Sequence, residues 1–375
     1  MHSQLKICLV TWYGSNNYGT NLQAYALYTF LKGMGHRVDL IRPFRGRRMF
    51  HQYPGMPNES VRSLKRVLKS ILGMRTPENI RQGKIMKFLK KEFSFAPLVR
   101  DENGIAEINA GYDCFVTGSD QIWNPYNLDT FYLLDFVKED AKKIAYSSSV
   151  AVNTIPEDLI PTYRHYLSQF KALSCRERTG AELLSGLLNR PVKTVLDPVL
   201  LLDGQTWVEF SQKSIYNRIK SVTEPFIFCY FIGDKDFEWK ALSEIKHKIG
   251  ISKVIVFSVS PSRYNNTEYE YMRAADIYDF VWFLHHACYV VTDSFHNIAL
   301  SIRLKKEFVA LMRCDNDVKS ENSRVSDFLE TFDIGFKTYM PASDNYLAPI
   351  PYDSVSCLLD KKIRECKNYL EDALI

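Results

Sequence analysis

The sequence predicts an α/β fold made of two parallel-sheet domains that face each other across a cleft. Short apolar runs with strand character alternate with amphipathic runs of helical spacing along the 375 residues, which is typical of βαβ units and parallel sheets. Several of the strand-like runs end in polar or Gly-rich turns. A break at Asp197-Pro198, near the middle of the chain, separates two sets of units. About two domains are expected for a chain of this length.

Hydrophobic periodicity locates the expected elements. Residues 5–11 form a short apolar run, and after a turn rich in Gly and Asn, Leu22, Tyr25, Ala26 and Phe30 recur on one face of a helix. The same reasoning predicts strands at 37–42, 114–117, 144–148, 172–175, 192–196, 226–232, 254–259, 289–292 and 308–312. It predicts further helices at 181–188, around Trp207, after residue 293, and at 352–374.

The elements group into two Rossmann-like domains and a final helix. We expect the first domain at 1–205, the second at 206–351, and a C-terminal helix at 352–375 that packs back on the first domain. In open parallel sheets, ligands bind beyond the carboxyl ends of the strands. We therefore expect the cleft to be lined by residues 12–19, 118–121, 175–178, 232–234 and 293–297.

The composition is that of a soluble globular protein, with 46% hydrophobic and 24% charged residues. No apolar run reaches the roughly 18–20 residues that span a bilayer, and the N-terminal run reads as a core strand rather than a signal peptide. Cys8, Cys114, Cys229 and Cys288 lie in apolar runs and are interpreted as reduced, buried cysteines. We expect a cytoplasmic protein, and no Cys or His spacing indicates a metal site.

Basic residues are concentrated at 42–91, although the net charge is only +5. Within this stretch, apolar residues recur at helical spacing from 61 to 71, and Arg62, Lys65, Arg66 and Lys69 lie between them. The first interpretation is an ordinary solvated helix face beside the cleft. The second is peripheral contact with the inner face of a membrane, where each basic residue contributes on the order of 1 kcal/mol. No nucleic-acid partner is expected.

Two loops follow strands of the first half. Residues 12–20 carry Asn17, Tyr18 and Gly19 where a helix starts, a place where backbone N–H groups bind anions or hydroxyls. The alternative is a tight βα turn that needs Gly and Asn. In the second loop, at 118–124, Asp120 would orient a hydroxyl and Trp123 would stack on a sugar, or else the Asp caps a helix and the Trp is buried.

Arginine and histidine side chains follow two further strands. Arg176 and Arg178 flank Glu177, and an Arg fork clamps phosphate or carboxylate with two parallel hydrogen bonds; a surface ion pair is the alternative. His296 lies in the first turn of a predicted helix, facing the cleft, and can give or take a proton near neutral pH. The helix N-terminus favours the neutral imidazole unless an acid such as Asp293 or a bound phosphate offsets it.

These motifs also occur in a fixed order along most of the chain. They are Asn17-Tyr18-Gly19, Leu22-Gln23-Ala24-Tyr25, Gly118-Ser119-Asp120-Gln121-Ile122-Trp123-Asn124, Ala145-Tyr146-Ser147-Ser148-Ser149, Ser174-Cys175-Arg176-Glu177, Leu196-Asp197-Pro198-Val199-Leu200-Leu201 and Val291-Thr292-Asp293-Ser294-Phe295-His296. Taken together, this ordered set resembles the polysaccharide pyruvyl transferase family. The chain departs from the family pattern at Asn297, where Gly is frequent, and at Glu307, where Pro is frequent.

The resemblance implies a GT-B-like fold, phosphoenolpyruvate as donor, a glycan or lipid-linked sugar as acceptor, and neither metal nor cofactor. By this resemblance His296 matches the catalytic His and Arg176 the donor-binding Arg, and Lys319 is the nearest match to a donor-binding Lys. We add Arg178 and Ser294 as donor-binding candidates. The candidates for the acceptor side of the cleft are Asn17, Tyr18, Gly19, Ser119, Asp120, Gln121 and Trp123.

Two other functions remain as alternatives. A GT-B glycosyltransferase that uses a nucleotide-sugar shares the fold, but no acidic nucleotide-binding signature such as Glu-x7-Glu stands out in the second half. A non-catalytic glycan-binding relative has no need of both Arg176 and His296.

Overall fold

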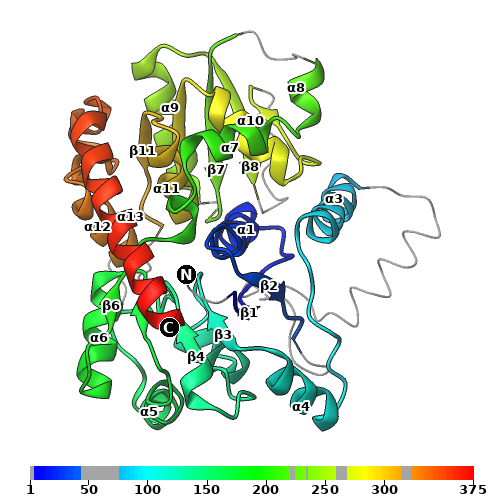
Figure 1. Cartoon of the computed structure of the whole chain (residues 1–375). Helices are drawn as coiled ribbons and strands as arrows, with labels where there is room; N and C mark the ends of the chain where they lie inside the picture. The colour runs from blue at the N-terminus through cyan, green and yellow to red at the C-terminus, as the bar shows by residue number, and fades with distance from the viewer. Residues whose placement is uncertain (1–3, 44–75, 220–223, 234, 259–267, 314–321) are drawn as a thin grey trace.

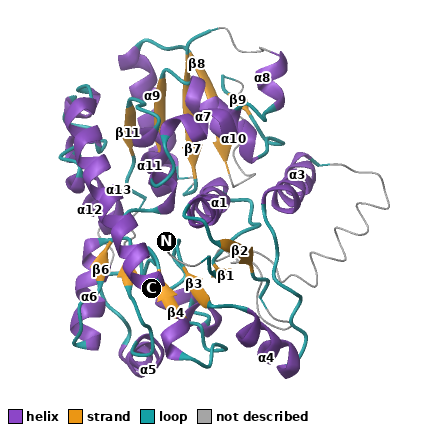
Figure 2. Cartoon of the chain, in the orientation of Figure 1, coloured by secondary structure: helices purple, strands orange, loops and turns teal. Residues whose placement is uncertain are grey.

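The computed structural model describes residues 4–43, 76–219, 224–233, 235–258, 268–313 and 322–375. Two parallel sheets lie one above the other in the view of Figure 1, and helices pack around both (Figures 1 and 2). The predicted α/β class with two Rossmann-like sheets is confirmed. Lys319 lies outside the described residues.

The strands are β1 (Lys6–Val10), β2 (Arg37–Leu40), β3 (Cys114–Thr117), β4 (Lys143–Ala145), β5 (Ser174–Cys175), β6 (Lys193–Thr194), β7 (Phe226–Phe231), β8 (Lys253–Ser258), β9 (Glu270–Tyr271), β10 (Tyr289–Thr292) and β11 (Phe308–Ala310). The helices are α1 (Tyr18–Gly33), α3 (Pro77–Glu92), α4 (Glu102–Gly111), α5 (Ile160–Leu167), α6 (Arg178–Leu188), α7 (Gly204–Ser211), α8 (Ile215–Ile219), α9 (Asp236–Ile249), α10 (Ile277–His286), α11 (Phe295–Arg303), α12 (Asn322–Thr331) and α13 (Tyr352–Leu374).

The first sheet has the strand order β2-β1-β3-β4, and the short pair β5-β6 continues it through bridges from Ile144 to Ala172 and from Ser148 to Cys175. Along β1, Ile7 and Leu9 enter one hydrophobic cluster while Cys8 and Val10 enter another. Both faces of this strand are therefore covered, which is why it reads as a continuous apolar run.

The second sheet has the order β11-β10-β7-β8-β9, and all of its pairs are parallel. Its central strand β7 is buried along its whole length. Phe228 and Tyr230 face the cluster that reaches the first sheet, whereas Ile227 and Cys229 face a separate cluster on the other side. The carboxyl end of β7 thereby lies near the start of α1.

Helix α1 lies between the two sheets (Figure 1). Its first residue, Tyr18, stacks on Phe280 with ring centroids 4.6 Å apart, and its hydroxyl donates to the carbonyl of Ala275 at 3.0 Å. The helix begins at Tyr18 rather than at Leu22 as predicted, because the side chain of Asn17 accepts a hydrogen bond from the N–H of Gly19 and caps it. Helix α1 thus belongs to the first half by sequence and to the contact between halves by packing.

The final helix α13 extends from the second sheet back to the first (Figure 1). Near its end, the hydroxyl of Tyr369 donates to the carbonyl of Ala145 at 2.7 Å, and the N–H of Leu196 donates to Cys366 Sγ at 3.2 Å. The segment before α13 is held by Glu307, which accepts from Lys337 Nζ at 3.1 Å and from the N–H of Ile350 at 2.9 Å. Glu307, one of the two departures from the expected family pattern, therefore has a structural role.

The basic stretch divides at residue 76. Residues 44–75, including Arg62, Lys65, Arg66 and Lys69, lie outside the described residues, so contact with a membrane stays a prediction. In α3, Arg81 is buried and its guanidinium donates to the carbonyl of Ser258 at 2.8 Å, so this cation serves packing. None of the helices in the described part of the chain is long and apolar enough to cross a membrane. The prediction of buried cysteines is wrong for Cys288, which is exposed.

Candidate active site

Three ionisable side chains meet where the two halves of the chain face each other. His296 stands in the first turn of α11, Arg176 follows β5, and Asp197 follows β6. The Nη1 atom of Arg176 lies 3.0 Å from Asp197 Oδ2 and 3.1 Å from His296 Nε2, and the latter two atoms are 3.3 Å apart. All three side chains are buried. Residues 120 positions apart in the chain therefore form one compact cluster.

The imidazole of His296 has two partners of opposite kind at the same nitrogen. The guanidinium of Arg176 can only donate a hydrogen bond, whereas the carboxylate of Asp197 can only accept one. A neutral imidazole with its proton on Nδ1 accepts from Arg176 through Nε2. A protonated imidazole donates from Nε2 to Asp197 instead. The geometry serves both protonation states, as a residue that transfers protons requires.

Asp197 is the buried acid that contacts both Arg176 and His296. Burial would raise the pKa of its carboxyl, but His296 and Arg176 outweigh burial and hold the pKa well below its usual range. The hydroxyl of Ser119 donates to the same Oδ2 atom at 3.2 Å. Although burial would lower the pKa of Arg176, Asp197 and Glu177 raise it, so the guanidinium stays charged.

The Arg176 side chain is fixed from two further directions. Its guanidinium lies over the ring of Phe295, with Cζ 4.2 Å from the centroid, and Glu177 Oε2 lies 3.9 Å from Nε. The other oxygen of Glu177 accepts from the Ser149 hydroxyl and from the N–H of Val150 at 2.9–3.0 Å. These contacts hold Arg176 in one place before any ligand arrives.

Helix α1 leaves space for the imidazole only because residue 19 is Gly. A Cβ built on Gly19 would lie 2.7 Å from His296 Nδ1 and 2.8 Å from His296 Cβ. Real Cβ atoms do not approach so closely, so any side chain here displaces the histidine. The Gly of the first loop therefore acts through packing against the catalytic candidate.

Several buried polar atoms around His296 have no hydrogen-bond partner among the described residues. They are Nε and Nη2 of Arg176, Oγ of Ser294, and both amide atoms of Asn297. Buried polar groups are nearly always paired in folded proteins, and exceptions gather at binding sites. Four of these five atoms can donate a hydrogen bond, and all five belong to the two motifs Ser174–Glu177 and Thr292–Asn297. This is the strongest structural indication of a ligand site.

The predicted residues of the first loop hold the structure around the site in place. Asn17 caps α1 and also accepts from the hydroxyl of Tyr230 at 3.1 Å. The ring of Tyr18 is fully buried between the two halves. Asp120 accepts a hydrogen bond from Thr20 at 2.7 Å, which ties the second loop to α1.

The second loop contributes Ser119 but not Trp123. The indole of Trp123 is fully buried and donates to the carbonyl of Tyr132 at 3.1 Å, so it does not stack on a sugar and the structural interpretation holds. Gln121 is half-buried and accepts from the side chain of Asn124 at 3.0 Å. Ser119 reaches the cluster through Asp197.

Arg178 and Asp293 lie apart from the cluster. Arg178 is exposed and pairs with Asp327 and Glu330 at 3.5 and 3.2 Å, the surface alternative considered above. Asp293 accepts from the N–H of Gly233 at 2.7 Å and so binds the carboxyl end of β7. The acid beside His296 is therefore Asp197, which is not among the site residues predicted from the sequence. In the sequence, the indication for Asp197 was its place directly after the strand-like run at 192–196.

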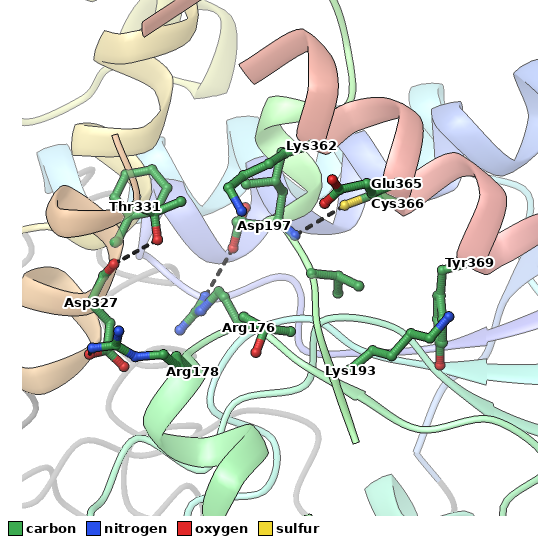
Figure 3. Close-up of a pocket in the computed structure, with 14 residues that line it drawn as sticks. Arg176, Arg178, Lys193, Asp197, Asp327, Thr331, Lys362, Glu365, Cys366 and Tyr369 are labelled. Carbon is green, nitrogen blue, oxygen red and sulfur yellow. Dashed lines mark hydrogen bonds and ion pairs between the residues drawn. The ribbon is translucent and has the colours of Figure 1, made fainter. Parts of the chain in front are cut away.

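A cavity of about 310 Å³ borders the cluster on the side of α12 and α13 (Figure 3). Arg176 and Asp197 form part of its wall, together with Lys193, Lys362 and Tyr369. Among the residues that the structure describes, no group of three or more His, Cys, Asp or Glu side chains is arranged to hold a metal ion.

The fold and site define a GT-B-like protein, with two Rossmann-like sheets and a charged cluster drawn from both halves. The structure resembles a protein from Listeria monocytogenes described as a UDP-N-acetylglucosamine 2-epimerase, with a TM-score of 0.53 and 9% identity over 100% of this chain and 90% of that one. A glycosyltransferase from Rickettsia africae matches with a TM-score of 0.47 and 12% identity over 98% and 99% of the two chains. No curated protein matches the chain.

The family follows from the sequence itself. The model of the family described as polysaccharide pyruvyl transferase matches residues 17–316, which is most of the chain. The chain belongs to the polysaccharide pyruvyl transferase family, as the ordered motifs predicted. The matched range contains Arg176, Asp197 and His296 and ends before α13.

Proposed function

We propose that the protein transfers the pyruvyl group of phosphoenolpyruvate to two hydroxyls of one sugar, forming a pyruvate ketal and releasing phosphate. The sugar belongs to a cell-surface polysaccharide or its lipid-linked precursor. The observation that supports this most is the cluster itself, in which His296 lies 3.1 Å from a buried arginine and 3.3 Å from a buried carboxylate. This cluster combines a proton donor with an anion clamp, and the reaction needs both.

Arg176 is assigned to the donor. Phosphoenolpyruvate carries a carboxylate and a phosphate, and the unpartnered Nε and Nη2 atoms of Arg176 are directed donors for such an anion. Because Phe295 and Glu177 hold the side chain in place, little conformational entropy is lost when the anion binds.

His296 is assigned to proton transfer. The imidazolium, stabilised by Asp197, gives its proton to the methylene carbon of the donor, and C2 becomes electrophilic. The first sugar hydroxyl bonds to C2 and returns its proton to the neutral imidazole. The C2–O bond to phosphate then breaks, and inorganic phosphate leaves with the bonding electrons. The second hydroxyl attacks C2 and its proton passes to the released phosphate, which closes the ketal.

A nucleotide-sugar transferase is the alternative that the fold leaves open, and ligand binding distinguishes the two. A ligand that binds only the native state raises the melting temperature in proportion to ln(1 + [L]/Kd). We expect phosphoenolpyruvate to raise the melting temperature and UDP or GDP to leave it unchanged. Stabilisation by a nucleotide and none by phosphoenolpyruvate would reverse the assignment.

A further inference from the structure

The cavity beneath α13 contains charged groups that the proposed chemistry has not yet used. Its volume is about 310 Å³, and it lies between the segment 193–197, α12 and α13. Arg176 and Asp197 face it, but His296 is not part of its lining. Arg176 therefore contacts His296 through Nη1 and also lines this cavity.

Arg176 has donor atoms that form no hydrogen bond with the described residues. Its Nη1 atom is occupied by Asp197 and His296, whereas Nε and Nη2 have no hydrogen-bond partner among the described residues. The side chain is 1% exposed. Arg176 is nevertheless part of the cavity wall, and a charged guanidinium at the wall of a cavity favours an anionic ligand there.

A second cation enters the cavity from the C-terminal helix. Figure 3 shows the side chain of Lys362 extending from α13 toward the pair formed by Arg176 and Asp197. Lys362 is half-buried and forms no ion pair with any carboxylate in the described part of the chain. Lys193 also lines the cavity, with its amine 5.8 Å from the ring centroid of Tyr369.

The other charges of the wall are already matched. Arg176 is paired with Asp197, and Arg178 is paired with Asp327. After these pairs, Lys193 and Lys362 remain against a single carboxylate, that of Glu365. The cavity therefore has one more positive than negative side chain in its wall, which favours an anionic ligand.

We propose that this cavity is a phosphate subsite, in which Arg176 and Lys362 bind the phosphate of the donor and release it after transfer. The identity of the donor rests on the proposed function, whereas the anion subsite rests on the cavity alone. A phosphate dianion needs more than one cation, and Lys supplies a point charge where Arg supplies a fork. Lys362 lies outside the range that matches the family model.

Titration of inorganic phosphate into the full chain at low ionic strength, followed by calorimetry, tests this subsite. The variant is Lys362→Gln, and the control is Lys361→Gln, which removes the same charge from an exposed position of the same helix. We expect Lys362→Gln to weaken phosphate binding about tenfold, the low end for a charge-assisted hydrogen bond. We expect Lys361→Gln to change it less than twofold. Phosphoenolpyruvate should compete with phosphate for the site.

The outcomes distinguish the existence of the anion subsite from the assignment of that subsite to the donor. Equal phosphate affinity in Lys362→Gln and the parent protein overturns the subsite, as does the absence of phosphate binding by the parent. Phosphate binding that depends on Lys362 but does not compete with phosphoenolpyruvate keeps the anion subsite and removes the donor assignment. Melting temperatures of the two variants should match, because both lysines are at least partly exposed.

Discussion

At the scale of single residues, the site depends on several side chains that all contact one carboxylate oxygen. Oδ2 of Asp197 accepts from Arg176 and Ser119 and lies 3.3 Å from His296 Nε2. The carboxylate therefore compensates the charge of Arg176 and can accept a hydrogen bond from His296. In the sequence, Asp197 precedes a Pro at the middle of the chain, and nothing there indicates a partner 99 positions away. Contacts of this range arise from the fold, which explains why Asp197 was missed.

A second buried acid gives a prediction about pH. Burial first, and the neighbouring Asp293 second, raise the pKa of Glu238 to about 8. The folded protein therefore holds a proton that the unfolded chain releases near pH 4–5, and the free energy of unfolding decreases as pH rises toward 8. Glu238→Gln removes this titration. We expect the melting temperature of the variant to exceed that of the parent by more at pH 9 than at pH 6.

Glu244→Gln is the control, because Glu244 lies on the same helix α9 and Lys248 lowers the pKa of its carboxyl. Loss of the Glu244 carboxyl should not produce a difference in melting temperature between variant and parent that grows above pH 6. Differential scanning calorimetry across the pH series measures both variants. A gap for Glu238→Gln that stays constant from pH 6 to pH 9 would contradict the assignment of a raised pKa.

At the scale of elements, α1 positions the site by packing. Two of its glycines make a matched pair, because a Cβ on Gly19 would lie 2.7 Å from His296 Nδ1 and a Cβ on Gly33 would contact nothing within 4 Å. We expect Gly19→Ala to lower turnover tenfold or more and to lower the melting temperature, since the imidazole must move. Gly33→Ala should keep full turnover and stability, because the helix accommodates Ala there. Equal turnover in the two variants would show that the contact has no role.

The elements themselves were largely predictable. Each strand of the predicted set exists within a few residues of its expected bounds, because buried parallel strands read as apolar runs. The start of α1 was misplaced by four residues, since the polar segment Tyr18–Asn21 is helical only through the Asn17 cap and its burial between sheets. Burial also accounts for the enclosed positions of Tyr18 and Trp123. Their aromatic rings suit a sugar by type, and only packing shows that both are enclosed.

At the scale of the whole molecule, the site exists because two halves of the chain meet. Arg176 and Asp197 come from the first half, His296 comes from the second, and α13 returns from the second to bring Lys362 to the same place. Neither sheet alone brings together Arg176 and His296, the proposed donor clamp and the proposed proton donor. This arrangement agrees with a reaction that must hold an anion, protonate it and expose it to a sugar.

The most direct test of the central claim is mass spectrometry of lipid-linked sugar acceptors incubated with phosphoenolpyruvate and the protein. We predict the appearance of an acceptor that carries one pyruvyl ketal, together with one equivalent of released phosphate. His296→Gln should reduce this product about 100-fold or more, since general acid catalysis contributes about 10²–10⁴-fold. Transfer of a sugar from a nucleotide-sugar in the same assay, with no pyruvyl product from any acceptor, would contradict the account.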